Sequence, residues 1–256
     1  MFGIIRQSLV PIRAEASHRS EMVSQLLFGE HYRVLDNDTE KDWIKIICAF
    51  DNYEGWISRL QHTEISEAYF EQIESSDYKV SLDLSSPILF KKERMNILLG
   101  SVLPFGSNEL FKMEETLAFG GESKPLSQKW KMPQMKELAL KYLNTPYLWG
   151  GRSPFGIDCS GFTQQVFKIC GYRLNRDASQ QFLQGVEIEF ENAKAGDLAF
   201  FGNDDKIDHV GLILEENRII HASGYVKIDT ISEVGVQNAE GEFTHKLKGV
   251  RRLINK

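Results

Sequence analysis

Asp158-Cys159-Ser160-Gly161 places a thiol, two polar neighbours and a glycine directly before a segment with helical periodicity. From Phe162 to Cys170 the apolar residues recur at helical spacing, and Gly171 ends the segment. At the first turn of a helix, unpaired backbone N–H groups and the helix dipole favour negative charge on a thiol. We therefore regard Cys159 as a candidate nucleophile rather than a residue that only fills space.

Two histidines that follow, His209 and His221, lie in segments with the pattern of strands. An imidazole beside a thiol can take up its proton and later return it to a leaving group. Taken alone, His209 could equally be a surface residue of a strand and His221 a hydrogen-bonded core residue. The Cys and His side chains could also bind zinc, but no further oxygen or sulfur ligand is evident, so we expect no metal and no cofactor.

The chain has 256 residues, of which 42% are hydrophobic and 26% charged, values typical of a globular protein with one to three domains. Its net charge of -6 gives no general attraction to phosphate backbones or anionic lipid, so we expect no nucleic-acid partner. No apolar run approaches the roughly 20 residues that span a bilayer. Residues 1–6 lack the pattern of a secretory signal, which predicts a cytoplasmic protein; a removed export signal would instead place it in the periplasm or outside the cell.

The character of the sequence changes near residue 126. Before it, short alternating or β-branched segments separated by turns favour small barrels, which we predict over residues 1–62 and, with a polar connector, over 63–125. The part from 85 to 121 could instead be an extension of one barrel rather than a barrel of its own. Residues 126–256 form the third predicted domain, with helices followed by antiparallel strands, so the predicted fold class is α+β. Its expected elements are helices at 135–143 and 162–170 and strands at 197–201, 210–215, 218–221 and 226–228.

A series of short motifs in this third domain carries a family resemblance. In order they are Pro146-Tyr147-Leu148-Trp149-Gly150-Gly151, Asp158-Cys159-Ser160-Gly161, Gly196-Asp197-Leu198, Asp208-His209-Val210-Gly211 and Ile220-His221-Ala222. With this order and spacing the chain resembles the NlpC/P60 cysteine peptidases over about residues 130 to 252. The resemblance implies a papain-like catalytic domain.

The first part of the chain is similar to bacterial SH3 (SH3b) domains, through Val10-Pro11-Ile12-Arg13, Gly29-Glu30 and Gly55-Trp56-Ile57. SH3b domains followed by an NlpC/P60 domain resemble the γ-D-glutamyl-L-diamino acid endopeptidases, which trim cell-wall peptides. The resemblance implies two small SH3-like barrels before the catalytic domain.

In this family the motif cysteine is the nucleophile and the first motif histidine is the base, which implies these roles for Cys159 and His209. His221 would hold the ring of His209 in the useful tautomer. The oxyanion that forms during attack would be met by backbone N–H groups near Cys159.

The resemblance also implies where substrate binds. Tyr147 and Trp149 would line the pocket, although both could simply pack the turn. Asp158 would hold the free amino group of an N-terminal L-Ala, because a half-buried ammonium needs a carboxylate partner. Ser160 and Ser179 could bind the carboxylate of γ-D-Glu, while the segment around Ser179 could equally be an ordinary helix N-terminus.

In the enzymes that this chain resembles, the first SH3b domain closes one end of the cleft and thereby demands a free N-terminus on the substrate. Tyr53 and Glu21 are the candidates for that contact, and both could equally be ordinary residues of the barrel surface.

The expected function is a cysteine endopeptidase that hydrolyses the bond between γ-D-Glu and a diamino acid, meso-diaminopimelate or L-Lys, in murein peptides with a free N-terminal L-Ala. One alternative is another amide hydrolase or an acyltransferase on the same scaffold. The other is a non-catalytic cell-wall-binding SH3b protein, against which an intact set of Cys159, His209 and His221 argues.

Overall fold

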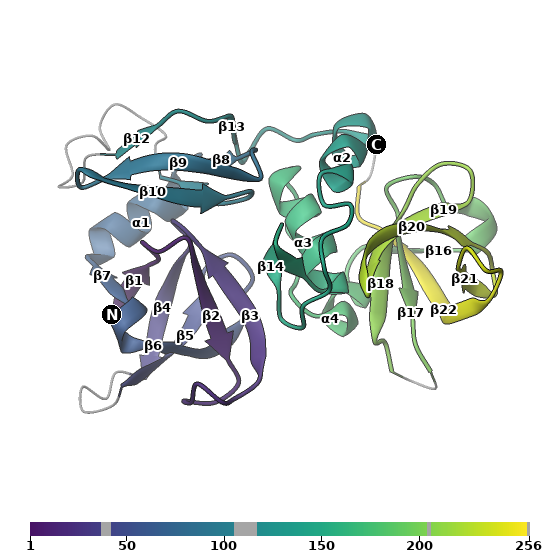
Figure 1. The fold of residues 1–256 in the computed structure, drawn as a ribbon, viewed down its shortest axis with the longest axis horizontal. Helices are drawn as coiled ribbons and strands as arrows, with labels where there is room; N and C mark the ends of the chain where they lie inside the picture. Colours follow the sequence, from purple (N-terminus) through teal and green to yellow (C-terminus); the bar gives the residue numbers. More distant parts are fainter. Residues whose placement is uncertain (37–41, 105–116, 204–205, 255–256) are drawn as a thin grey trace. The chain divides into compact units, whose positions relative to one another are not determined.

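The computed structural model describes residues 1–36, 42–104, 117–203 and 206–254. It divides into two compact units, drawn as a ribbon in Figure 1. The first unit comprises Met1–Lys129 with the short segment Gly150–Pro154, and the second comprises Trp130–Trp149 with Phe155–Lys256. The predicted domain boundaries, between residues 62 and 63 and between residues 125 and 126, stay predictions. Among the described helices, none combines the length and hydropathy required to cross a bilayer.

The first unit begins with an SH3-like sheet of seven antiparallel strands in the order β3-β2-β6-β5-β4-β1-β7. Alternate residues of β5 are buried, as expected for strands with one face on a core. Ile44 and Ile46 thereby join Val10, Ile12 and Leu26 in one cluster. The strands are β1 (Phe2–Ile4), β2 (Leu9–Arg13), β3 (Met22–Leu27), β4 (His31–Asp36), β5 (Trp43–Cys48), β6 (Glu54–Ser58) and β7 (Thr63–Ile65), with the 3-10 helix η1 (Arg59–Gln61) before β7.

The described part of residues 66–129 contains one helix and two three-stranded sheets, in the orders β10-β9-β12 and β11-β8-β13. Its core of Ile88, Ile97 and Leu103 includes Phe28, which follows β3 of the first sheet. Residues 105–116 of the predicted second barrel lie outside the described residues. The elements are α1 (Glu67–Ser75), β8 (Lys79–Ser81), β9 (Ser85–Phe90), β10 (Glu93–Leu98), β11 (Val102–Leu103), β12 (Leu117–Phe119) and β13 (Ser123–Pro125).

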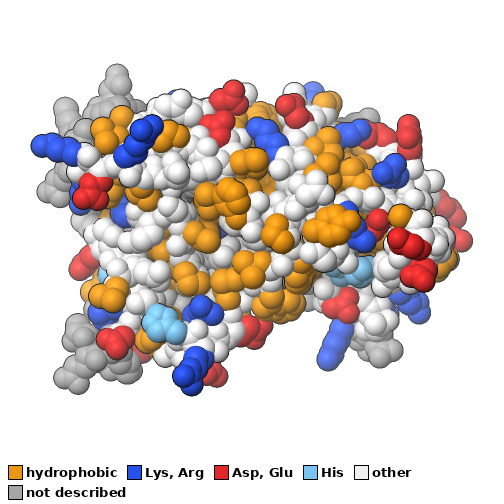
Figure 2. All heavy atoms as spheres, viewed as in Figure 1, with side chains coloured by type: hydrophobic (Ala, Val, Ile, Leu, Met, Phe, Trp, Pro, Cys, Tyr) orange, Lys and Arg blue, Asp and Glu red, His pale blue; other side chains and the backbone are white. Residues whose placement is uncertain are grey.

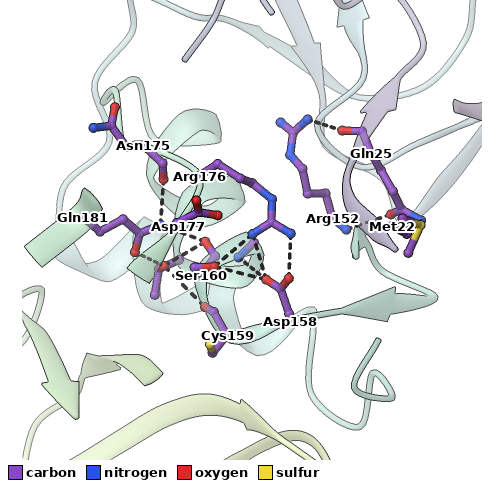
Figure 3. Close-up of polar contacts among 12 residues, drawn as sticks. Met22, Gln25, Arg152, Asp158, Cys159, Ser160, Asn175, Arg176, Asp177 and Gln181 are labelled. Atoms are coloured by element: carbon purple, nitrogen blue, oxygen red, sulfur yellow. Dashed lines mark hydrogen bonds and ion pairs between the residues drawn. The ribbon is translucent and has the colours of Figure 1, made fainter. Parts of the chain in front are cut away.

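The segment Gly150–Pro154 is bound into the first unit by the buried side chain of Arg152. Its guanidinium forms two hydrogen bonds of 2.9 Å with the carboxylate of Glu30. A further hydrogen bond reaches the backbone carbonyl of Gln25 (Figure 3). A buried arginine needs such a partner, because an unpaired charge there would be strongly destabilising.

The second unit places helices before an antiparallel sheet in the order β16-β22-β17-β18-β19-β20-β21. Because β21 also pairs with β22, the six strands from β17 to β22 close into a small barrel. Its elements are α2 (Met132–Leu140), β15 (Gly156–Ile157), α3 (Cys159–Ile169), α4 (Ala178–Phe182), β16 (Val186–Ile188), η3 (Phe190–Asn192), β17 (Leu198–Phe201), β18 (His209–Ile213), β19 (Arg218–Ser223), β20 (Tyr225–Ile231), β21 (Gly235–Gln237) and β22 (Phe243–Arg252). The strand β14 (Arg152–Ser153) lies in the segment that belongs to the first unit.

The predicted helix at 162–170 begins three residues earlier, at Cys159 itself, because Asp158 caps it. Every residue of α3 is buried, so this helix is the core of the unit and not an amphipathic surface helix. The expected strand at 226–228 extends from Tyr225 to Ile231, and β21 and β22 were not expected.

Gly29 offers a test of how closely the two parts of the first unit approach. It adopts a left-handed conformation with φ 78° between β3 and β4, and a Cβ atom there would overlap the carbonyl oxygen of Val102. We expect Gly29→Ala to lower the free energy of unfolding by about 2–4 kcal/mol, from the backbone strain and the overlap together.

The matched control is Gly224→Ala, at φ 74°, where an added Cβ meets no atom within 4 Å. It should cost only the backbone strain, about 1–2 kcal/mol. Hydrogen exchange of the amides in β3 and β4, and of those in β19 and β20, measures the two effects locally. Equal losses in the two variants would contradict the close approach at Val102.

Candidate active site

Cys159 is the first residue of α3, and its thiol is buried. Asp158, in extended conformation before it, caps the helix: its Oδ1 accepts a hydrogen bond of 2.6 Å from the backbone N–H of Gly161. The sequence thereby holds Cys159 at the one end of a helix where unpaired backbone N–H groups are available.

The side chain of Asp158 is also paired with Arg176, which is 1% exposed. The guanidinium donates to Oδ2 at 2.6 Å and to Oδ1 at 3.0 Å, and to the hydroxyl of Ser160 at 2.9 Å (Figure 3). Arg176 was not among the predicted site residues, because its neighbours in the sequence do not distinguish a buried arginine from an exposed one. Asp158 and Ser160 therefore have firm partners before any substrate arrives, and their predicted contacts with substrate stay predictions.

His209 and His221 lie on neighbouring strands, β18 and β19, and are joined by a hydrogen bond of 2.7 Å between Nε2 of His209 and Nδ1 of His221. The chain of contacts continues to β20, where Oδ2 of Asp229 lies 3.0 Å from Nε2 of His221. Asp229 in turn forms an ion pair of 3.0 Å with Lys227. Nothing in the sequence marks Asp229 or Lys227 as part of the site beyond their spacing of two residues, which puts both on one strand face.

The thiol of Cys159 lies against the start of β18. Its Sγ is 4.0 Å from the carbonyl oxygen of Asp208, and the backbone N–H of Val210 interacts with it as well. These two residues flank His209 in the sequence. The structure thus brings together Cys159, His209 and His221, the three residues predicted to be catalytic, and their individual roles stay predictions.

Burial shifts the pKa values of both Cys159 and His209. Burial raises the pKa of Cys159 to about 12, and the charge of Asp158 adds to it, while nearby backbone N–H groups and Arg176 oppose the shift. Burial also lowers the pKa of His209 well below its usual range, and the neighbouring His221, His245 and Lys227 act in the same direction. Desolvation thus outweighs the helix N-terminus, and both shifts favour the neutral forms of the thiol and of the imidazole.

A third histidine, His245 on β22, stacks on His209 with ring centroids 4.1 Å apart and ring planes 26° from parallel. Each of His209, His221 and His245 offers a nitrogen within 4.8 Å of the others, the spacing of a possible metal site. Lone pairs lie in the plane of an imidazole ring, so two nearly parallel rings do not direct them at one point. The geometry is that of a stacked pair, and the absence of a metal stays an expectation.

The predicted substrate residues of the second unit differ in exposure. Tyr147 is half-buried, and burial, followed by the charges of Cys159 and Asp158, raises the pKa of its hydroxyl, which therefore lies near both. Trp149 is 59% exposed. Ser179 is exposed on the short helix α4, whose N-terminus is closed by a capping box between Asp177 and Gln180.

Two further candidates lie in the first unit. Tyr53 is half-buried and packs against the core of the seven-stranded sheet, while Glu21 is exposed next to the start of β3. Their predicted contact with substrate stays a prediction.

Comparison with known proteins gives the following matches. Residues 144–245 match the NlpC/P60 family, and residues 12–60 match the bacterial dipeptidyl-peptidase Sh3 domain. The chain is 28% identical to a gamma-D-glutamyl-L-lysine dipeptidyl-peptidase of Bacillus subtilis, over 78% of this chain and 71% of that protein. It is 27% identical to dipeptidyl-peptidase 6 of Lysinibacillus sphaericus, over 87% and 88%. The chain also superposes on the crystal structure of an NlpC/P60 family protein from Bacillus cereus, to which it is 19% identical. The superposition covers 100% of both chains with a TM-score of 0.78, which shows a shared fold.

The protonation state of Cys159 can be measured directly. Since burial raises its pKa, the thiolate fraction near neutral pH is lower than for a free cysteine, whose pKa is about 8.5. The measurement is the rate at which iodoacetamide alkylates Cys159 between pH 6 and 10, followed by mass spectrometry, with N-acetylcysteine as the reference thiol. We expect the rate for Cys159 to keep rising at pH values above the midpoint of the rate profile of N-acetylcysteine. A plateau already reached near pH 6 would instead indicate a preformed thiolate–imidazolium pair.

Proposed function

We propose that this chain, which carries an NlpC/P60 peptidase domain and a bacterial SH3 domain, is a cysteine peptidase acting on cell-wall peptides. The bond that we propose it cleaves joins γ-D-Glu to a diamino acid, in recycling or turnover of murein peptides with a free N-terminal L-Ala. The observation that carries the proposal is the cluster of Cys159, His209 and His221 at the start of α3. The name of the Bacillus subtilis relative, a gamma-D-glutamyl-L-lysine dipeptidyl-peptidase, supports the choice of bond.

The proposed reaction begins from the neutral pair. As the thiol of Cys159 attacks the carbonyl carbon of γ-D-Glu, its proton passes to His209, and the oxyanion is stabilised by backbone N–H groups at the start of α3. His209 then returns the proton to the amine of the diamino acid, which leaves, and an acyl-enzyme remains. Water, deprotonated by His209, hydrolyses the acyl-enzyme and restores the thiol.

Selection of a free N-terminus follows from the charges near the nucleophile. Asp158 carries the carboxylate beside Cys159, and the hydroxyl of Tyr147 lies close to both. An ammonium that enters a partly buried site needs such acceptors, because losing its hydration without them is costly. Arg176 already pairs with Asp158, so the substrate ammonium would be the second cation on this carboxylate and would contact it together with Tyr147.

Nucleic acid is not part of the proposal. On the face seen in Figure 2, acidic and basic side chains are interspersed and do not gather into one large field of a single sign. This agrees with the net charge of -6, which gives no general attraction to a polyanion.

Peptide hydrolysis tests the proposed bond and the free amine together. We expect release of the diamino acid from L-Ala-γ-D-Glu-meso-diaminopimelate or from L-Ala-γ-D-Glu-L-Lys, detected by liquid chromatography. Acetylation of the N-terminus removes a charged hydrogen bond and should lower kcat/KM by roughly 10- to 100-fold. Equal cleavage of both forms would rule out selection of the amine, and no cleavage of any of these peptides would rule out the proposed substrate.

The nucleophile is tested by substitution. Cys159→Ala should reduce turnover by about 10⁴-fold or more while the far-ultraviolet circular dichroism stays that of the wild type. The matched control is Cys48→Ala, which removes another buried thiol, one that lies in the core of the seven-stranded sheet, and should retain kcat. Peptide hydrolysis that persists in Cys159→Ala would contradict the mechanism.

A further inference from the structure

The histidine pair of the second unit ends on a buried carboxylate, that of Asp229 on β20. We propose that Asp229 is a positioning residue that fixes the tautomers of His221 and His209, so that Nδ1 of His209 is the atom free to accept a proton. The inference rests on the proposed peptidase function for its kinetic consequence, while its structural consequence can be measured without any substrate.

The register of the sheet produces this arrangement. His221 on β19 lies directly opposite Lys227 on β20, and Asp229 follows two residues later on the same face. The carboxylate of Asp229 therefore reaches both the ring of His221, at 3.0 Å, and the ammonium of Lys227, also at 3.0 Å. His221 is 0% exposed and Asp229 8% exposed, so water does not compete effectively for these contacts.

The carboxylate of Asp229 is ionised in this setting. Burial alone would raise its pKa, but the hydrogen bonds from His221 and Lys227, together with their charges, outweigh burial and hold the pKa below its usual value. An ionised carboxylate has no proton to give and acts only as an acceptor. The hydrogen of the 3.0 Å contact must therefore belong to Nε2 of His221.

The tautomer of His221 in turn determines the tautomer of His209. A neutral imidazole with its proton on Nε2 has a lone pair on Nδ1. Nδ1 of His221 lies 2.7 Å from Nε2 of His209, so Nε2 of His209 must be the donor of that hydrogen bond. Neutral His209 then carries its lone pair on Nδ1, the nitrogen left to act as a base.

Lys227 is the cationic partner of Asp229, and its ammonium lies 3.0 Å from the same carboxylate oxygen that faces His221. The other titratable groups that face this chain are His245 on β22, Asp208 next to His209, and Cys159 on α3.

The sharpest perturbation is Asp229→Asn, which keeps the size of the side chain and changes its hydrogen-bonding character. The amide can present its NH2 group to Nε2 of His221, which reverses the direction of every following hydrogen bond. His209 would then hold its proton on Nδ1 and lose its function as a base. By analogy with the wrong tautomer that such a change creates in serine proteases, we expect kcat to fall by about 10²- to 10⁴-fold, with KM within about threefold.

The matched control is Asp197→Asn, also at a buried carboxylate of the same unit. Asp197 pairs with Arg252 and makes no part of the histidine chain. It should lower stability as any lost buried ion pair does, without changing the tautomers of His209 and His221 or the pH dependence of kcat.

Tautomers are read from long-range ¹H–¹⁵N spectra of the whole chain labelled at histidine. We expect the Nε2–H form of both His209 and His221 in the wild type and the Nδ1–H form of His209 in Asp229→Asn. An Nδ1–H form of either ring in the wild type overturns the proposal, and so does an Asp229→Asn variant with unchanged tautomers and unchanged kcat.

These outcomes separate the proposal from the proposed function. A wild-type protein that cleaves no murein peptide but shows the expected tautomers contradicts the function and supports the positioning by Asp229. If Asp229→Asn does not fold, the spectrum of the wild type still decides the assignment.

Discussion

The ion pair between Asp158 and Arg176 is the contact on which the proposed site depends. One carboxylate caps α3 and accepts two hydrogen bonds from a fully buried guanidinium. Without Arg176, Asp158 would be an unpaired charge at the centre of the unit, a situation that costs about 3–5 kcal/mol. Because Cys159 is the next residue, the position of the thiol is set by how firmly this carboxylate is held. Asp158 thus fixes the position of Cys159 through the backbone, apart from its proposed contact with substrate.

Around this fixed point, burial and hydrogen bonding act in opposite directions on the reacting groups. Burial favours the neutral forms of Cys159 and His209, which disfavours a resting ion pair. In the proposed mechanism, the chain from His209 through His221 to Asp229 orients the imidazole, so that the proton of the thiol has a defined acceptor. A site of this kind gains its reactivity from arrangement more than from the intrinsic nucleophilicity of its sulfur.

The parts of the structure that could be predicted from the sequence are those encoded locally. The helix after Cys159 and the strands that carry His209 and His221 follow from periodicity, turn residues and motif order. The buried pairing of Arg176 could not be predicted, because the local sequence around an arginine before a short helix is the same whether its side chain is exposed or buried. Asp229 lay beyond the expected end of its strand, because β20 is lengthened by pairing of Thr230 and Ile231 with β21. Such pairing depends on contacts distant in sequence, as does the stacking of His245 on His209.

The burial of Cys159 has a consequence for oxidation. Peroxide attacks a thiolate and reacts poorly with a protonated thiol, so the raised pKa of Cys159 disfavours its conversion to sulfenic acid. In the proposed reaction, its sulfur becomes strongly nucleophilic only while His209 is taking the proton, when the carbonyl carbon of the substrate occupies the site. The same desolvation that makes the resting sulfur less reactive therefore protects it between turnovers.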